Sequence, residues 1–151
     1  MTLEAGVTAP EVSLQNQDGD VIDVDLDGPV VLYFYPRDHT SGCTTEARQF
    51  ELERSTYEEA GVAIYGISTD DVETHASFCE AEELGFDLLA DTDASVAEAY
   101  EVPMRSNQTM RTTFVVIDGE INRVYQRVNP DGHAREVLMD LLDAGIVELE
   151  G

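Results

Sequence analysis

The chain of 151 residues has the length of one ordinary domain, and 42% of its residues are apolar. Its formal net charge of -24 arises from 32 acidic residues and 8 arginines, with no lysine, which makes nucleic acid and anionic membranes poor partners. The apolar residues fall in periodic runs, which argues against disorder, and no run approaches the roughly 18 apolar residues of a membrane span.

The first third of the chain predicts a small hairpin and then a buried strand. An Asp-Gly turn at 18–19 separates the alternating residues 12–14 from the apolar residues 21–22. The continuous apolar run 30–35, which Pro36 ends, predicts a strand that is buried on both faces.

The middle third predicts two helices with a buried strand between them. The first helix has a buried stripe at helical spacing, formed by Cys43, Ala47, Phe50 and Tyr57. Cys43 therefore lies in the first turn of that helix. A strand over 62–67 leads into the second helix, which Asp70 or Asp71 caps. Three residues share an inward face of this second helix, namely Val72, Ala76 and Cys79.

The last third predicts a short helix over 94–100, an irregular stretch over 102–110 and a third buried strand over 113–117. An Asp-Gly turn then leads into a strand over 121–128.

The closing helix has the clearest periodicity in the chain. Asn129 is expected to be its N-cap, Pro130 its first residue and Gly145 the residue that ends it. Its apolar stripe comprises Ala134, Val137, Leu138, Leu141 and Leu142. Together the elements predict an α/β fold in one domain, residues 1–151, with a central mixed β-sheet flanked by helices and an N-terminal hairpin. This is the plan of the thioredoxin superfamily.

The segment 35–46 reads YPRDHTSGCTTE and contains the most specific pattern in the chain. It places Pro36, Thr40 and Cys43 at the spacing P-x-x-x-T-x-x-C. Taken alone, a cysteine on an apolar helical stripe is usually a small buried hydrophobe, and the other two would be ordinary loop residues. Only the combination is specific.

That spacing resembles the active-site pattern of the peroxiredoxins, and the residues around it resemble the bacterioferritin comigratory protein, or Q-type, branch. The similarity covers nearly the whole chain, from Ala9-Pro10 to the segment RTTF at 111–114. The resemblance implies a thioredoxin-like fold and a thiol-dependent peroxidase that reduces hydrogen peroxide and organic hydroperoxides. A thioredoxin-like protein would be the reductant.

A peroxidatic cysteine must be a thiolate, whereas an ordinary thiol with a pKa near 8.5 is mostly protonated at neutral pH. The first turn of a helix supplies unpaired N–H groups and the positive end of the helix dipole near Cys43. The resemblance assigns Arg111 as the charge that assists the thiolate and Thr40 as the hydroxyl that orients the peroxide. It also implies that Pro36 shields the sulfur and that Glu46 anchors Arg111 or the loop.

Two interpretations of Cys79 are possible. Because it shares a helix face with Val72 and Ala76, it can be a packed core thiol. Many Q-type proteins carry a resolving cysteine five positions after the nucleophile, but Arg48 stands there in this chain. A subset carries it in the following helix, so the resemblance favours a disulfide between Cys43 and Cys79. Because bridged Cα atoms lie within about 7 Å, the first turn after Cys43 is expected to be mobile.

A metal site formed by the histidines and the cysteines is one hypothesis, since the chain has three histidines, His39, His75 and His133. No paired-ligand motif accompanies them, and scattered histidines are more often surface residues. Nucleotide-binding glycine motifs are also lacking. We therefore expect no metal and no cofactor.

Two other functions fit parts of the sequence. A thioredoxin-like disulfide oxidoreductase normally uses a Cys-x-x-Cys pair, but Glu46 stands where the second cysteine would be. A redox sensor or holdase would use oxidation of Cys43 to bind a protein partner. A sensor reacts once with peroxide and stays oxidised, whereas a peroxidase turns over with its reductant.

The N-terminal residues lack a signal pattern, and two cysteines suit a reducing compartment, so we expect a cytoplasmic protein. The short C-terminus favours a monomer. The acidic surface resembles that of proteins from salt-accumulating halophiles, in which a Debye length of about 3 Å at 1 M salt screens self-repulsion. We therefore expect structure to be lost when salt is removed.

Overall fold

A computed structural model of the protein describes residues 2–148. It contains a seven-stranded mixed sheet of order β2-β1-β5-β4-β3-β8-β9, and a separate two-stranded ribbon of β6 and β7. The elements are β1 (Ser13–Gln15), β2 (Val21–Asp23), β3 (Val30–Phe34), α1 (Ser41–Glu59), β4 (Ala63–Ser68), α2 (Val72–Glu82), β5 (Asp87–Ala90), α3 (Ser95–Ala99), β6 (Met104–Arg105), β7 (Gln108–Thr109), β8 (Thr112–Ile117), β9 (Glu120–Gln126) and α4 (His133–Asp143). This arrangement confirms the predicted α/β plan.

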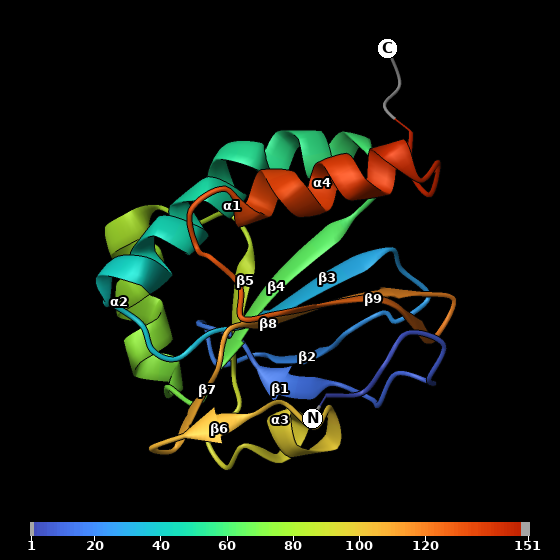
Figure 1. Ribbon diagram of the computed structural model, residues 1–151. Coiled ribbons are helices and arrows are strands. Elements are labelled where there is room, and N and C mark those ends of the chain that lie inside the picture. Colours follow the sequence, from blue (N-terminus) through green and yellow to red (C-terminus); the bar gives the residue numbers. More distant parts are fainter. Residues whose placement is uncertain (1, 149–151) are drawn as a thin grey trace.

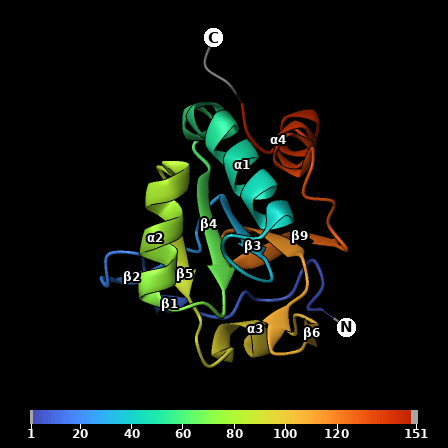
Figure 2. The same ribbon diagram turned by 90° about the vertical axis from the view of Figure 1, so that its left-hand side faces the viewer.

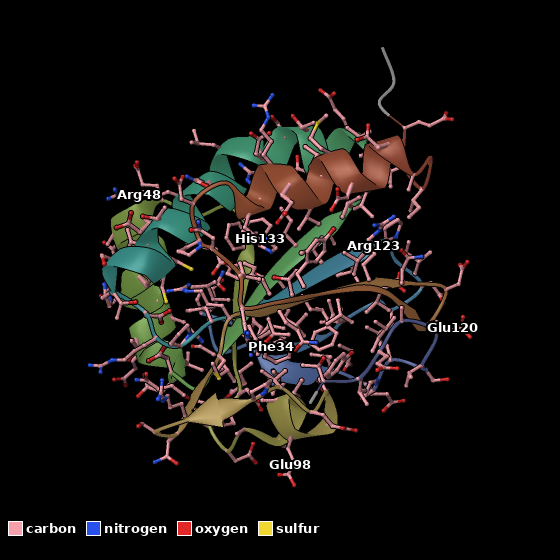
Figure 3. The ribbon with its side chains drawn as sticks, viewed as in Figure 1. Phe34, Arg48, Glu98, Glu120, Arg123 and His133 are labelled. Atoms are coloured by element: carbon pink, nitrogen blue, oxygen red, sulfur yellow. The ribbon has the colours of Figure 1, made fainter. Side chains whose placement is uncertain are left out.

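The helices lie on both faces of the sheet. Helices α1, α2 and α4 cover one face, and α3 lies on the other with the N-terminal segment (Figures 1 and 2). Each face buries its own apolar cluster, as alternate residues of a central strand require. Figure 3 shows Phe34 inside the molecule and the carboxylates of Glu98 and Glu120 at its periphery.

The pairing of β3 places two distant parts of the chain at one edge of the sheet. β3 runs parallel to β4 and antiparallel to β8, with Phe34 opposite Thr112. The chain leaves β3 for the loop that precedes α1 at the same edge where it enters β8. This register brings Arg111, the residue before β8, beside the start of α1.

Helix α1 is fixed to the sheet and to α4 by its aromatic residues. The ring of Phe50 stacks on Tyr33 of β3 with 4.5 Å between centroids, and the Tyr57 hydroxyl donates to the Ala134 carbonyl at 2.5 Å. Gly66 makes room for Tyr33, because a Cβ at this glycine would lie 2.8 Å from the ring. The body of α1 is therefore a rigid support for its first turn.

β5 and the β6–β7 ribbon were not predicted from the sequence. β5 has only four residues and no β-branched side chain, so its strand conformation depends on insertion between β1 and β4. The ribbon lies in the stretch described as irregular and turns through Ser106 and Asn107, both with positive φ, as a two-residue hairpin turn requires.

Helix α4 begins later than predicted. Its N-cap is Gly132, with φ 87°, whereas Asn129 accepts a hydrogen bond from the N–H of Asp131 in a preceding turn. Pro130 belongs to that turn. The left-handed backbone at Gly132 separates the turn from the helix, which makes the predicted N-cap wrong. Gly145 follows the end of α4, as predicted.

The buried face of α2 also differs from the prediction. His75, Phe78 and Cys79 are buried, whereas Val72 and Ala76 are only half-buried. The expectation that the histidines lie on the surface is wrong for His75 and His133, which are both buried, because each ring finds polar partners inside the protein. Within residues 2–148, the structure has no helix that is both long and apolar enough to span a membrane.

Candidate active site

Cys43 is the third residue of α1 and its side chain is 1% exposed. The first intrahelical bond runs from the Thr44 N–H to the Thr40 carbonyl at 2.9 Å. The N–H groups before it, including that of Cys43, therefore have no acceptor within the helix. Thr40 is the N-cap but makes no side-chain cap bond. The sulfur thus lies where a negative charge is favoured by free N–H donors and the helix dipole.

Arg111 contacts this sulfur directly. Its Nη2 donates to the Cys43 Sγ at 3.3 Å, while Nη1 donates to Oε1 of Glu46 at 3.0 Å. Gly42 is essential to this approach, because a Cβ at position 42 would lie 2.6 Å from Nη2. Glu46 therefore holds the guanidinium beside the thiol through a hydrogen bond, and the absence of a side chain at Gly42 leaves space for it.

Glu46 lies one helical turn after Cys43 and is fully buried. Burial raises the pKa of its carboxyl to about 7, although the charge and hydrogen bond of Arg111 act in the opposite direction. Oε2 has no hydrogen-bond partner within residues 2–148. A carboxyl in this setting is suited to holding Arg111 rather than to acting as a base towards solvent.

Thr40 and Pro36 occupy the loop between β3 and α1. The Thr40 hydroxyl donates to the Arg37 carbonyl at 2.9 Å, which leaves the lone pairs of this oxygen free to accept a hydrogen bond from a peroxide. Pro36 is half-buried and lines a surface hollow together with Arg111. The structure therefore brings five of the predicted site residues together, which are Pro36, Thr40, Cys43, Glu46 and Arg111.

Cys79 is a free, buried thiol on α2, and it belongs to the same apolar cluster as Cys43. Burial raises the pKa of the Cys79 thiol to about 12, with the charges of Asp38, Asp87 and Asp18 adding to the effect. In the folded, reduced protein Cys79 is thus fully protonated at neutral pH. It becomes a competent nucleophile only when α2 opens to solvent.

A buried polar cluster that the sequence analysis missed joins the active-site loop to α2. One carboxylate oxygen of Asp38 accepts from the Tyr35 hydroxyl at 2.5 Å, and the other lies 2.6 Å from Nδ1 of His75. Nε2 of His75 lies 3.0 Å from the Leu89 carbonyl, and the Asp38 N–H donates to Asp70 at 2.7 Å. We call this group, Asp38 with His75, the loop clamp.

Asp38, Asp70 and His75 also lie close enough together to hold a metal ion, with ligand atoms within 4.8 Å of one another. The same atoms already satisfy one another or the backbone through hydrogen bonds, so the cluster needs no ion to account for its geometry. The only feature of the sequence that could have indicated this polar cluster is the position of His75, one helical turn before Cys79 on α2.

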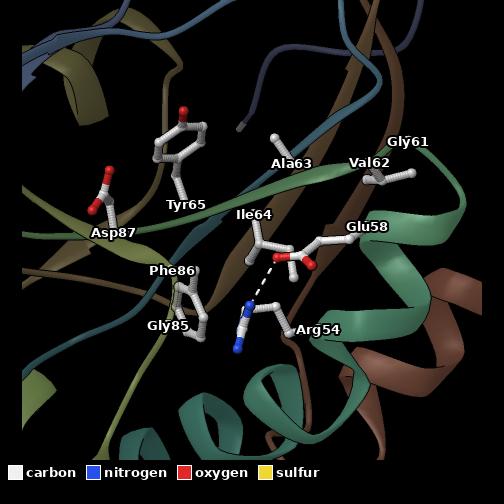
Figure 4. Close-up of a pocket in the computed structure, with 10 residues that line it drawn as sticks. All are labelled: Arg54, Glu58, Gly61, Val62, Ala63, Ile64, Tyr65, Gly85, Phe86 and Asp87. Carbon is white, nitrogen blue, oxygen red and sulfur yellow. Dashed lines mark hydrogen bonds and ion pairs between the residues drawn. The ribbon is translucent and has the colours of Figure 1, made fainter.

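Two surface hollows differ in their relation to this site. A hollow of about 430 Å³ lies between α1 and the β4–β5 edge, where Arg54 donates to Glu58 at 2.8 Å (Figure 4). It is lined neither by Cys43 nor by the loop before α1. A hollow of about 390 Å³ includes Pro36 and Arg111 and so adjoins the reactive sulfur.

A thioredoxin-like fold that presents a cysteine at a helix N-terminus beside an arginine has the geometry that a thiol-dependent peroxidase requires. The sequence model of the AhpC/TSA family matches residues 5–124. The chain therefore belongs to the AhpC/TSA family. It is 40% identical to a putative peroxiredoxin Bcp of Coxiella burnetii, over 91% of this chain and 98% of the relative, which places it among the peroxiredoxins of the Bcp and Q type.

Named relatives support this assignment over almost the full length. The chain is 35% identical to Peroxiredoxin Bcp of Bacillus subtilis, over 95% of this chain and 98% of the relative. The crystal structure of Peroxidoxin BcpB from Mycobacterium tuberculosis has a TM-score of 0.85 at 33% identity, over 93% and 97% of the two chains. The bacterioferritin comigratory protein of Xanthomonas campestris, described with alkyl peroxide reduction activity, has a TM-score of 0.84 at 28% identity, over 93% and 99%.

Proposed function

We propose that the protein reduces hydroperoxides by a two-cysteine cycle in which Cys43 is the peroxidatic cysteine and Cys79 resolves it. The observation that carries the proposal is the 3.3 Å contact between Nη2 of Arg111 and the Cys43 sulfur at the start of α1. A fixed cation and free N–H donors stabilise both the thiolate and the oxygen that becomes negative as the O–O bond breaks.

In the first step the Cys43 thiolate attacks the terminal oxygen of the hydroperoxide. The S–O bond forms, the O–O bond breaks, and the leaving alkoxide takes a proton, so that a sulfenic acid and an alcohol, or water, result. The Cys43 N–H and Arg111 bind the peroxide oxygens, while Thr40 accepts the peroxide hydrogen bond and Pro36 limits access of water. Glu46 acts through Arg111 as a positioning residue.

In the second step the Cys79 thiol condenses with the sulfenic acid, which forms a disulfide and releases water. Two of the solved structures of Xanthomonas campestris peroxiredoxin Q are cysteine-to-serine mutants, and the two mutated positions lie 36 residues apart, as Cys43 and Cys79 do. The buried, protonated state of Cys79 requires α2 and the first turn of α1 to unwind locally before the bond forms.

A thioredoxin-like dithiol completes the cycle by reducing the disulfide and becoming oxidised itself. None of these steps requires a metal or an organic cofactor. We place the protein in a reducing cytoplasm as a monomer, in which residues 1–151 act as one domain. The charge of -24 further supports an organism with high internal salt, and no role in binding nucleic acid or membranes.

The competing function is a redox sensor that uses the same thiol. The test is steady-state consumption of hydrogen peroxide at molar salt with a thioredoxin and its reductase in excess. We expect many equivalents to be consumed for each protein molecule, and consumption to fall to the uncatalysed rate in Cys43→Ser. Consumption that stops at one equivalent would support the sensor instead.

A further inference from the structure

A groove beside the active-site loop has a charge unlike that of the rest of the surface. The hollow of about 390 Å³ at Pro36 adjoins one of about 220 Å³, and the two share Met110, Arg111 and Arg127. The combined lining comes from the β6–β7 ribbon, the entry to β8 and the end of β9. It also includes Arg105, and we call it the arginine groove.

The arginine groove contains no carboxylate, although 32 of the 151 residues are acidic. Three other hollows on the described surface each contain two acidic residues, which are Glu58 with Asp87, Glu11 with Asp23, and Asp118 with Glu120. An acid-free hollow with three arginines therefore stands out against a strongly negative surface. Such a site attracts anions that the remainder of the molecule repels.

Two of these arginines are unpaired. Within residues 2–148, Arg105 and Arg127 make neither an ion pair nor a side-chain hydrogen bond, and both are exposed. By contrast, Arg48, Arg54 and Arg135, which lie away from the groove, each pair with a glutamate. Guanidinium groups left free in a groove are available to bind a carboxylate through paired N–H donors.

The groove also adjoins two residues beside the reactive sulfur, although the buried Cys43 is not part of its lining. Arg111 lines it and donates to the Cys43 sulfur, and Pro36 belongs to both the groove and the active-site loop. The uncharged part of the lining includes the apolar residues Pro36, Met110 and Val128. It also includes the polar residues Ser106, Gln108 and Thr109. A ligand that fits this surface has an anionic end, an apolar body and a group that reaches Cys43.

We propose that the arginine groove is a substrate site for organic hydroperoxides that carry a carboxylate, in which Arg105 and Arg127 bind the carboxylate while the peroxide group reaches Cys43. The assignment rests on the proposed peroxidase function and adds a preference for negatively charged substrates. Arg105 and Arg127 then determine specificity, whereas the chemistry of the O–O bond belongs to Cys43 and Arg111.

The test compares para-carboxycumene hydroperoxide with its methyl ester, since the two differ in charge but share the reacting group. We expect the ratio of kcat/KM for the acid over the ester, at fixed molar salt, to be about 10 or more in the wild type. In the double variant Arg105→Gln/Arg127→Gln the ratio should fall to about 1, through a rise in KM for the acid. The double variant Arg48→Gln/Arg135→Gln removes the same charge elsewhere and should keep the ratio.

A ratio near 1 in the wild type, or a high ratio that survives in Arg105→Gln/Arg127→Gln, would overturn the proposal. The proposal would also be overturned if Arg105→Gln/Arg127→Gln kept the ratio and had a raised KM for the reductant. That result would mean that the groove binds an acidic surface of the reductant and not the substrate.

Binding of para-isopropylbenzoate, which has no peroxide group, separates this proposal from the peroxidase function. Calorimetry should give at least ten-fold weaker binding to the groove variant than to the wild type and the control variant. Equal binding by all three would contradict the groove, even if the protein were an active peroxidase. Loss of binding in the groove variant would support it, even if hydrogen peroxide were not consumed.

Discussion

Arg111 contacts two groups that compete for its charge, the sulfur of Cys43 and the carboxyl of Glu46. The carboxyl holds the guanidinium in place, but when it is ionised it also partly neutralises the positive charge that acts on the Cys43 sulfur. Burial limits that competition, because the raised pKa of Glu46 means that the carboxyl is partly protonated near neutral pH. In a molecule of net charge -24, this balance keeps one cation available to the thiolate.

The first prediction at this scale concerns Gly42. In Gly42→Ala the new methyl group would meet Nη2 of Arg111 at 2.6 Å and push the flexible guanidinium away from Cys43. Because alanine favours a helix by up to about 1 kcal/mol over glycine, thermal stability should be kept or slightly raised. We expect kcat/KM for hydrogen peroxide to fall by about 10- to 100-fold. Ser41→Ala, in the same turn, adds no bulk and is the control, and equal activity of both variants would refute the role of the contact.

The second prediction follows from the pKa of Glu46, which is raised from 4.5 to about 7. Between these values the folded protein binds more protons at this group than the unfolded chain, so the contribution of Glu46 to stability is lost as pH rises through the window. Glu46→Gln lacks this titration. From pH 5 to pH 8 the free energy of unfolding should fall further in the wild type than in the variant, by on the order of 1 to 3 kcal/mol. Parallel pH profiles in urea unfolding at constant salt would show that Glu46 is not the cause.

At the scale of elements, the proposed cycle requires the loop before α1 and helix α2 to stay together while Cys43 reacts and to separate when Cys79 forms the disulfide. The loop clamp of Asp38 and His75 holds them together from inside, and Arg48 pairs with Glu82 across the surface between α1 and α2. The surface pair contributes little by itself, because exposed ion pairs are usually worth under about 1 kcal/mol. We therefore expect the buried clamp to oppose opening more strongly than the surface pair does.

The variant Asp38→Asn tests the clamp. It leaves His75 facing an amide inside the protein, and loss of one partner of a buried pair costs about 3 kcal/mol or more. Urea unfolding should show that loss, whereas Asp23→Asn, at an exposed aspartate that does not act on Cys79, should stay within about 0.5 kcal/mol of the wild type. Cys79 should also react faster with an alkylating reagent in the reduced Asp38→Asn protein. Equal stability and equal alkylation in both variants would argue against a clamp.

The elements also show which parts of the structure a sequence can predict. The helix that carries Cys43 and the strand before it were predicted because each has a strong, local apolar pattern. The contact of Arg111 with Cys43 depends on the register of β3 against β8, so it came from resemblance and not from the pattern. The loop clamp joins residues 37 positions apart through tertiary packing alone, and no local signal marks it.

At the scale of the whole molecule, the acidic surface sets the conditions under which the protein is stable. Few of the 32 carboxylates can pair with 8 arginines, so the folded state carries strong self-repulsion at low ionic strength. We expect circular dichroism to show loss of helix on dialysis from molar salt to about 10 mM, where the Debye length grows to about 30 Å, and recovery when salt is restored. An unchanged spectrum would contradict the idea that screening stabilises this fold.

The most direct test of the two-cysteine cycle is intact-mass spectrometry after treatment with one equivalent of hydrogen peroxide at molar salt. Thiols are alkylated within seconds, and the wild type is compared with Cys43→Ser and Cys79→Ser. The proposed cycle predicts that the wild type loses both free thiols as an intramolecular disulfide, that Cys79→Ser gains an oxygen adduct on Cys43, and that Cys43→Ser stays reduced. If Cys79 remains alkylatable in the wild type while Cys43 is oxidised, Cys79 is not the resolving thiol, and if neither cysteine reacts, Cys43 is not a peroxidatic cysteine.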